Sequence, residues 1–321
     1  MRFVNCQLND ICVCCVYLHK DKRKNAECLL SFGEVKGLSK NKSFFSKVII
    51  YTLLTLTLIV VFFPILSLVL SSFKTNSEIM TTPEKLFSPA PTFDNYIEAW
   101  NSENFRVSSM LFNSIWYSSI TVVITLFLSA VCGYVFARGE FRGKKLFFAI
   151  FSSLMFISLG SITIYPTFSI LSRLRLNNSL WGLIVMQCFG IPVVQMYIVR
   201  GFVNALPHEL DEAAKIDGCS FTSTFFRIIL PNLKPVMITI GMLAFNSSWN
   251  SYLMPTLFTM ARPDQQTLIV GIMALKNSGE AASSWNLMFA ATTIALIPVL
   301  VVYFFGNKYI TEGMAAGAVK G

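Results

Sequence analysis

The sequence predicts an all-α polytopic membrane protein with six transmembrane helices and both termini in the cytoplasm. Its composition is apolar, since hydrophobic residues make up 54% and charged residues 13% of the 321 positions. A soluble domain has about 25% charged residues. Six long runs carry no charged side chain, and Lys and Arg gather in alternate connections between these runs.

Six runs in the sequence contain no Asp, Glu, Lys, Arg or His, and each is long enough to cross about 30 Å of hydrocarbon as a helix. A charge at the centre of such a run would cost roughly 2.5–3.5 kcal/mol on insertion. In lipid, backbone polar groups must be satisfied within the segment, which a helix achieves. One transmembrane helix is therefore expected in each of the runs 48–73, 107–137, 146–172, 176–199, 235–261 and 281–307.

The distribution of positive charge predicts the orientation of these helices. The connections that would share a side with the N-terminus (1–47, 138–145, 200–234 and 308–321) hold 19 Lys and Arg, and the other three hold 7. The positive-inside rule then puts both termini in the cytoplasm. The net charge of +9 suits an anionic inner leaflet, so no nucleic-acid partner is expected.

Residues 1–47 form a basic extension that differs in composition from the rest of the chain. It carries five of the eight cysteines. Their spacing matches no standard zinc pattern, although a site built from Cys12, Cys14, Cys15, His19 and Cys28 is conceivable. We expect reduced cytoplasmic thiols, no metal and no cofactor. The predicted organisation is this extension, a permease domain over 48–307 and a cytoplasmic tail over 308–321.

Two features interrupt the early membrane segments and their connections. The connection 74–106 is rich in Pro, Ser and Asn and carries Tyr96 and Trp100, so it reads either as a loop returning to the outer face or as a docking site for an external partner. Runs three and four contain Gly160, Pro166, Gly190 and Pro192, helix breakers that neighbouring helices can accommodate.

Run five carries an unusual polar stretch, FNSSWNSYLMP, near its centre. Side chains of this kind can hydrogen-bond between helices, which contributes about 0.6 kcal/mol per contact. Alternatively, Asn246, Trp249 and Asn250 line a translocation pathway, in which amides would bond sugar hydroxyls and the indole would stack on a sugar face. Both interpretations stay open from the sequence.

The loop 204–235 between runs four and five is charged and predicts a helix-turn-helix at the membrane surface. Pro207 suits a first helical turn, and Glu209, Asp211 and Glu212 favour its positive end. Gly218 permits the positive φ of a turn. A second helix is expected from Cys219, with Phe221, Phe225, Ile228 and Ile229 on one face and with Pro231 and Pro235 ending it. Such an element could lie along the inner leaflet or dock into a soluble partner.

The residues of this loop resemble the EAA signature of bacterial ABC importer permeases. Seven positions match its pattern: Glu212, Ala213, Ala214, Gly218, Ile228, Leu230 and Pro231. The stretches SSFKTNSEI, NSIWYSSITVVITLFLSAVCGYVFAR, WNSYLMPTL and EGMAAGAVKG are similar to the carbohydrate-uptake branch, specifically its maltose-type second permease. The resemblance covers about residues 48–321 and leaves the Cys-rich extension outside.

The resemblance implies a binding-protein-dependent importer of a sugar, an oligosaccharide, in the bacterial cytoplasmic membrane. Its partners would be a second permease subunit, two cytoplasmic ATP-binding subunits and an extracellular solute-binding lipoprotein. The loop would seat in a cleft on an ATPase subunit. The implied coupling residues are Glu212, Ala213, Ala214, Asp217, Gly218, Leu230 and Pro231.

Two other functions compete with this one. An ion-coupled secondary transporter usually buries ionisable groups in its helices, and the six runs have none. An integral membrane enzyme would need clustered carboxylates, histidines or metal ligands, whereas the two histidines, His19 and His208, are far apart. The chain also lacks the G-x-x-x-x-G-K-[ST] phosphate loop, so a transport subunit without its own ATPase site, and no enzyme, is expected.

Overall fold

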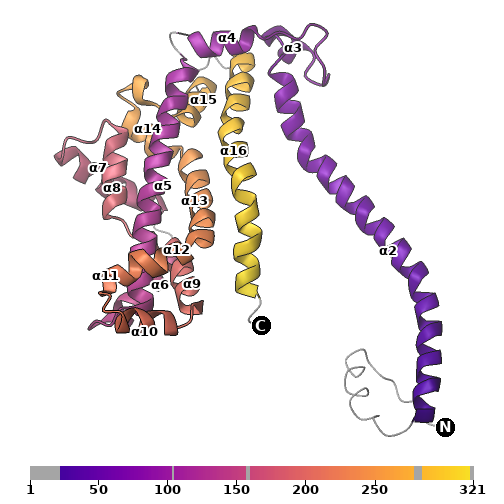
Figure 1. The fold of residues 1–321 in the computed structure, drawn as a ribbon. Helices are drawn as coiled ribbons and strands as arrows, with labels where there is room; N and C mark the ends of the chain where they lie inside the picture. The colour runs from indigo at the N-terminus through magenta and orange to yellow at the C-terminus, as the bar shows by residue number, and fades with distance from the viewer. Residues whose placement is uncertain (1–21, 103–104, 157–159, 278–283, 319–321) are drawn as a thin grey trace. The chain divides into compact units, whose positions relative to one another are not determined.

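In the computed structural model the described backbone comprises residues 22–102, 105–156, 160–277 and 284–318, with side chains described from 46 to 308 except at 160 and 161. Helices account for all regular structure in this part of the chain (Figure 1). The chain divides into two compact units, Met1–Leu66 and Ser67–Gly321. Cys6, Cys12, Cys14, Cys15 and His19 lie outside the described residues.

Helix α2, Lys22–Ser71, begins within the basic extension and continues through the first apolar run. The side chains of residues 46–66 are exposed. An apolar helix of this kind is suited to a lipid or protein surface rather than to water.

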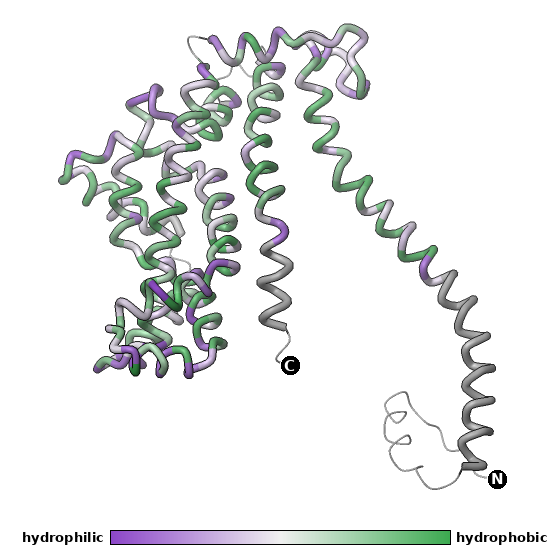
Figure 2. The backbone as a smooth tube through the Cα atoms, viewed as in Figure 1, coloured by the Kyte–Doolittle hydropathy of each residue, from purple (hydrophilic) through white to green (hydrophobic). Residues whose placement is uncertain are grey.

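The second unit is built around one long helix, α5, Val107–Arg138. It packs against α9, Val193–Ala205, and α13, Lys234–Trp249, and α13 in turn packs against α16, Trp285–Ala318. Gly133 lets α5 approach α9 closely, because a Cβ there would lie 2.5 Å from Val199 Cγ1. Apolar residues cover these helices and polar residues gather at their ends (Figure 2).

Three of the uncharged runs are not continuous helices, which corrects the prediction of one helix for each run. Run three comprises α6, Lys144–Phe156, a 3₁₀ turn η1, Gly160–Thr163, and α7, Ile164–Arg173. Run four comprises α8, Leu180–Phe189, and α9. These two helices are bent by 42° relative to one another, where Gly190 and Pro192 interrupt the helical hydrogen bonds. Run five stops at Trp249 and resumes as α14, Leu253–Thr259.

Length and hydropathy alone identify three helices in the described part that could cross a membrane: Ser46–Ser71, Val107–Arg138 and Trp285–Lys308. Up to five spans result if each of two bent helix pairs counts as one, the second pair being Phe221–Asn232 with Lys234–Trp249 at 77°. The described part of the chain is therefore all-helical, with helices long and apolar enough to cross a membrane.

The connection 74–106 is folded. It contains α3, Asn76–Thr81, and α4, Asp94–Asn101, and α4 packs on α16 and α5. Buried Asn95 joins this region together: its Nδ2 donates to the carbonyls of Ser72 and Lys74, both at 2.8 Å, and its Oδ1 accepts from Asn286 Nδ2 at 2.8 Å. The hydrogen bonds of the Asn95 amide fix the connection to residues 72–74 and to the start of α16.

A further helix, α15, Leu268–Asn277, follows the 3₁₀ turn η3, Pro263–Gln265, within the stretch 262–280 that the sequence suggested was only a link. Its residues Leu268, Val270 and Ile272 are buried. The apolar run is too short to cross a membrane, so a scan for spans passes over it.

The surface helix-turn-helix lies at the opposite end of α5 from α4 (Figure 1). It consists of α10, Glu209–Ile216, then α11, Phe221–Thr224, a π-helical turn η2, Phe225–Ile229, and α12, Leu230–Asn232.

Candidate coupling element and membrane cavity

The first limb of the helix-turn-helix has the local structure that its residues predict. Helix α10 carries Glu209, Asp211 and Glu212 in its first turn, where the partial positive charge of the helix favours carboxylates. Asp217 caps its C-terminus, and Gly218 follows with φ of +74°. A Cβ at Gly218 would meet nothing within 4 Å, so the backbone conformation, not space, requires glycine here.

The second limb differs from the prediction in where it ends. Pro231 is predicted to stop the helix, but it lies within the continuous helix Phe221–Asn232, directly after the π-helical turn η2. The helix continues to Asn232 and turns by 77° at Leu233 before α13 begins. Of the apolar face predicted for this limb, Phe225 and Ile229 are buried while Phe221 is 46% exposed.

Arg138, the last residue of α5, uses all three guanidinium nitrogens to bind the first limb and the residues that lead into it. Its Nε lies 2.8 Å from Asp211 Oδ2, in a geometry that makes an ion pair rather than an aligned hydrogen bond. Nη1 donates to His208 Nε2 at 2.7 Å, and Nη2 donates to the Leu206 carbonyl at 2.8 Å. The fixed fork of a guanidinium allows such a set of contacts, and a lysine could not reproduce it.

Tyr134, one turn earlier on α5, holds the second limb. Its ring centroid lies 4.5 Å from that of Phe221 and 5.1 Å from that of Phe225, and its hydroxyl donates to the Phe221 carbonyl at 3.4 Å. Buried Phe225 and Ile229 also join the hydrophobic cluster formed by α5, α9 and α13. The end of α5 is therefore attached to both limbs.

The residues proposed for coupling are divided between a free surface and the interior. Glu212, Ala213, Asp217 and Gly218 are exposed, whereas Ala214 is only 1% exposed. Pro231 is exposed and half-buried Leu230 packs on the hydrophobic cluster under the second limb.

Ile216 is an additional exposed residue of the first limb, at 86%. It lies four positions after Glu212, hence on the same helical face. An exposed isoleucine beside a carboxylate and a small residue is suited to a protein interface. The spacing within EAAKIDG carried this signal, because Ile216 follows Glu212 by about one helical turn.

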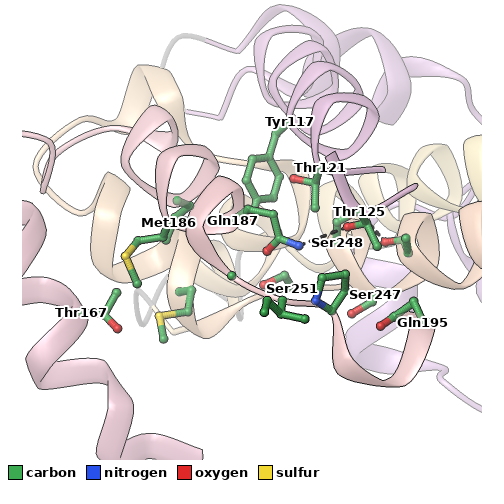
Figure 3. Close-up of a pocket in the computed structure, with 16 residues that line it drawn as sticks. Tyr117, Thr121, Thr125, Thr167, Met186, Gln187, Gln195, Ser247, Ser248 and Ser251 are labelled. Atoms are coloured by element: carbon green, nitrogen blue, oxygen red, sulfur yellow. Dashed lines mark hydrogen bonds between the residues drawn. The ribbon is translucent and has the colours of Figure 1, made fainter. Parts of the chain in front are cut away.

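A second feature is a cavity of about 470 Å³ between α5, α13 and the break that separates α8 from α9. Its wall includes hydroxyl and amide side chains from α5, α8, α9 and α13, as Figure 3 shows. Gln187 Nε2 donates to Thr125 Oγ1 at 3.1 Å across it. The polar members of the lining are Tyr117, Thr121, Thr125, Thr167, Gln187, Gln195, Ser247, Ser248 and Ser251.

The residues predicted to line a pathway lie beside this cavity but not on its wall. Trp249 is 2% exposed and stacks on Phe245 at 5.4 Å between ring centroids. Asn250 ends α13, and its Nδ2 donates to the carbonyl and Oδ1 of Asn246, both at 2.9 Å. Ser247, Ser248 and Ser251 of the same polar stretch face the cavity instead. A pathway role for Asn246, Trp249 and Asn250 stays a prediction.

Within the described part of the chain, no group of three or more His, Cys, Asp or Glu side chains could hold a metal ion. Cys132, Cys188 and Cys219 are free thiols.

Comparison with known proteins identifies the family. Residues 129–315, which include the helix-turn-helix and most of the cavity, match the binding-protein-dependent transport system inner membrane component. The chain belongs to this family. The resemblance noted from the EAA signature is thereby confirmed.

Whole-length relatives of the permease support the same conclusion. The chain is 30% identical over 289 residues to a probable ABC transporter permease protein, YurM, of Bacillus subtilis, covering 90% of this chain and 93% of that one. It is 30% identical to the arabinooligosaccharides transport system permease protein AraQ of Halalkalibacterium halodurans, with 81% and 91% covered. It is 31% identical to the diacetylchitobiose uptake system permease protein NgcG of Streptomyces coelicolor, with 84% and 88% covered.

A solved structure has the same fold. A chain of a bacterial ABC transporter involved in the import of the acidic polysaccharide alginate superposes with a TM-score of 0.70 at 20% identity, covering 82% of the permease and 95% of that chain.

Proposed function

We propose that this permease is a subunit of a binding-protein-dependent ABC importer that moves a sugar, an oligosaccharide, across the bacterial cytoplasmic membrane. Relatives named for arabinooligosaccharides, galactooligosaccharides and diacetylchitobiose support this substrate class. ATP would be hydrolysed by partner subunits, since the chain has no phosphate loop of the G-x-x-x-x-G-K-[ST] type. It would act without a cofactor or a catalytic residue of its own.

The proposed topology is six crossings with both termini in the cytoplasm. The excess of Lys and Arg on one set of connections supports it. The broken runs three, four and five would each make one crossing, with their irregular backbone buried in protein or lining a polar cavity, as the bilayer requires. The helix-turn-helix, the extension 1–47 and the tail 308–321 would then all be cytoplasmic.

The observation that carries the proposal is the attachment of one membrane helix, α5, to both limbs of the helix-turn-helix. A partner that moves this element would move the end of α5 with it. Glu212, Ala213, Ile216 and Asp217 would form the surface that meets the ATPase, Gly218 the turn, and Ala214, Leu230 and Pro231 the support behind it.

The proposed assembly contains this chain and a second, similar permease as a heterodimer, two ATP-binding subunits and an extracellular solute-binding lipoprotein. Family membership supports these kinds of partner. The ion-coupled secondary transporter considered from the sequence would need none of them.

The test is uptake into proteoliposomes that contain the assembled complex. We expect uptake of a labelled neutral oligosaccharide that requires both internal ATP and the loaded binding protein. Accumulation by this chain alone on an imposed ion gradient would overturn the proposal. In a cysteine-free background, Asp217→Cys should react with an impermeant maleimide from the cytoplasmic side, and reaction from the outer side would also overturn it.

A further inference from the structure

The cavity between α5, α13 and the α8–α9 break has no role in the coupling described above. It could be a packing defect, a site filled by the second permease, or a place where substrate binds. Its volume of about 470 Å³ lies within the range of about 300–1,000 Å³ that is usual for small-molecule sites. We propose that it is a sugar-binding subsite in this subunit, and that the sugar it takes is uncharged. This inference rests on the proposed transport function.

The polar side chains of the cavity are available to a ligand. Gln195, Ser247 and Ser251 make no side-chain hydrogen bond to other described residues, while Gln187 bonds Thr125 across the cavity. Amides and hydroxyls can each both donate and accept. Sugar hydroxyls have the same double capacity, so the two sets of groups are complementary.

The helix breaks add backbone groups to the same wall. Gly190, Ile191 and Pro192, between α8 and α9, all line the cavity, and Ser251 lies in the gap between α13 and α14. A broken helix leaves carbonyls without intrahelical donors. At membrane depth such groups persist only where protein or a polar ligand path can satisfy them.

The charge of the cavity predicts the charge of its ligand. None of its 16 lining residues, all within the described chain, is charged. A carboxylate or sulfonate in a site of low dielectric constant would need a cationic or strongly donating partner. Arg200, on α9, is not available for this, because its Nε donates to the Phe136 carbonyl at 3.3 Å and its guanidinium stacks 3.9 Å above the Phe148 ring. A uronate or sulfonated sugar would therefore be unfavourable here.

The experiment measures ATP-dependent uptake by the reconstituted complex with four probes: arabinotriose, galactotriose, diacetylchitobiose and an alginate trisaccharide. We expect the wild type to transport at least one neutral probe and not the acidic one. Gln187→Leu, Gln195→Leu and Ser247→Ala should each raise KM about fivefold, the effect of one lost hydrogen bond. Gln265→Leu, outside the cavity on η3, is the matched control and should change nothing.

Two substitutions of opposite charge at one cavity residue test whether the transported sugar is neutral. The binding protein is the same in both measurements, so its own selectivity does not affect the comparison. For a neutral sugar, Gln195→Glu and Gln195→Lys should reduce uptake to within about twofold of one another. An acidic ligand would be slowed at least about tenfold more by the Glu variant than by the Lys variant, and that result would overturn the charge assignment.

The outcomes separate the two proposals. No ATP-dependent uptake of any probe by the wild type contradicts the proposed function itself. Normal wild-type uptake with unchanged KM in all three cavity variants overturns only the subsite. Loss of the second permease from purified Gln187→Leu, Gln195→Leu and Ser247→Ala complexes would assign the cavity to subunit assembly and equally overturn it.

Discussion

Arg138 at the end of α5 lies 2.8 Å from Asp211 on the first limb of the helix-turn-helix, and the two side chains are only 6% and 15% exposed. The guanidinium also bonds His208 and the Leu206 carbonyl. A link of this kind joins a membrane helix to a surface element with little freedom between them.

Replacing Arg138 should disconnect the two elements. Arg138→Met is expected to reduce uptake at least about tenfold, because it leaves Asp211 unpaired at a cost on the order of 3 kcal/mol. Arg138→Lys keeps the charge but loses the guanidinium fork that also bonds His208 and the Leu206 carbonyl, so it should reduce uptake as well. ATP hydrolysis by the assembled complex should persist, which distinguishes lost transmission from lost assembly. A double-mutant cycle with Asp211→Asn measures the coupling of the pair, and additive effects would contradict it.

Replacing Glu212 should weaken contact with the ATPase without changing the fold of the permease. Glu212→Ala is expected to abolish uptake while insertion and expression stay normal, because the side chain is exposed. The matched control is Glu209→Ala, which removes a carboxylate from the same first turn of α10. Equal uptake by the two variants would argue against a specific role for Glu212.

The effect of a substitution at Gly218 on uptake should depend on whether the new residue accepts a positive φ, and not on the size of its side chain. With φ of +74° and no atom within 4 Å of a built Cβ, Gly218→Asn should keep most uptake. Gly218→Val should lose on the order of 1–2 kcal/mol of local stability, and Gly218→Pro should abolish uptake. The measurement is uptake per inserted complex, and a loss in the Asn variant as large as in the Val variant would exclude this explanation.

Substitution at Gly133 should affect stability through packing. Gly133→Val would force a side chain into Val199, since even a Cβ lies 2.5 Å from its Cγ1. We expect a cost of about 1–3 kcal/mol, measured as a lower unfolding temperature in detergent. Gly201→Ala is the control on α9, because a Cβ there meets nothing within 4 Å. A similar fall in both variants would contradict the packing explanation.

Changing Asn250 distinguishes the two interpretations of the polar stretch in run five. Asn250→Leu removes hydrogen bonds to Asn246 at the end of α13 but nothing from the cavity wall. We expect an unchanged KM with a small loss of thermal stability. A raised KM would instead support the pathway role predicted for Asn246 and Asn250 from the sequence.

Much of the fold was predictable, because the lipid bilayer strongly constrains which structures can cross it. An uncharged run of more than twenty residues has few alternatives to a membrane helix, and the turn at Gly218 followed from one glycine among helix-forming residues. The breaks in runs three to five were harder to locate. Glycine and proline marked them, but whether a breaker bends or interrupts a helix depends on its neighbours in space.

The site was predictable in its position along the chain but not in its contacts. The EAA residues identified the helix-turn-helix, yet nothing in the sequence near Arg138 or Tyr134 indicates which limb each would contact. In run five, Asn246, Trp249 and Asn250 were the residues predicted to line a pathway, and packing divided the polar stretch differently. Trp249 turned into the interior and Ser247 toward the cavity.

The π-helical turn Phe225–Ile229 has a consequence for how this protein can vary. Such a turn contains one residue more than the α-helical geometry needs, and each α-helical residue advances the chain by about 100°. Deleting a single position there would remove the extra residue and convert the turn to regular α-helix, so the residues on either side would keep their orientation. In homologous chains this turn should therefore tolerate the loss of one residue, whereas a one-residue deletion in a regular α-helix would turn buried side chains toward solvent.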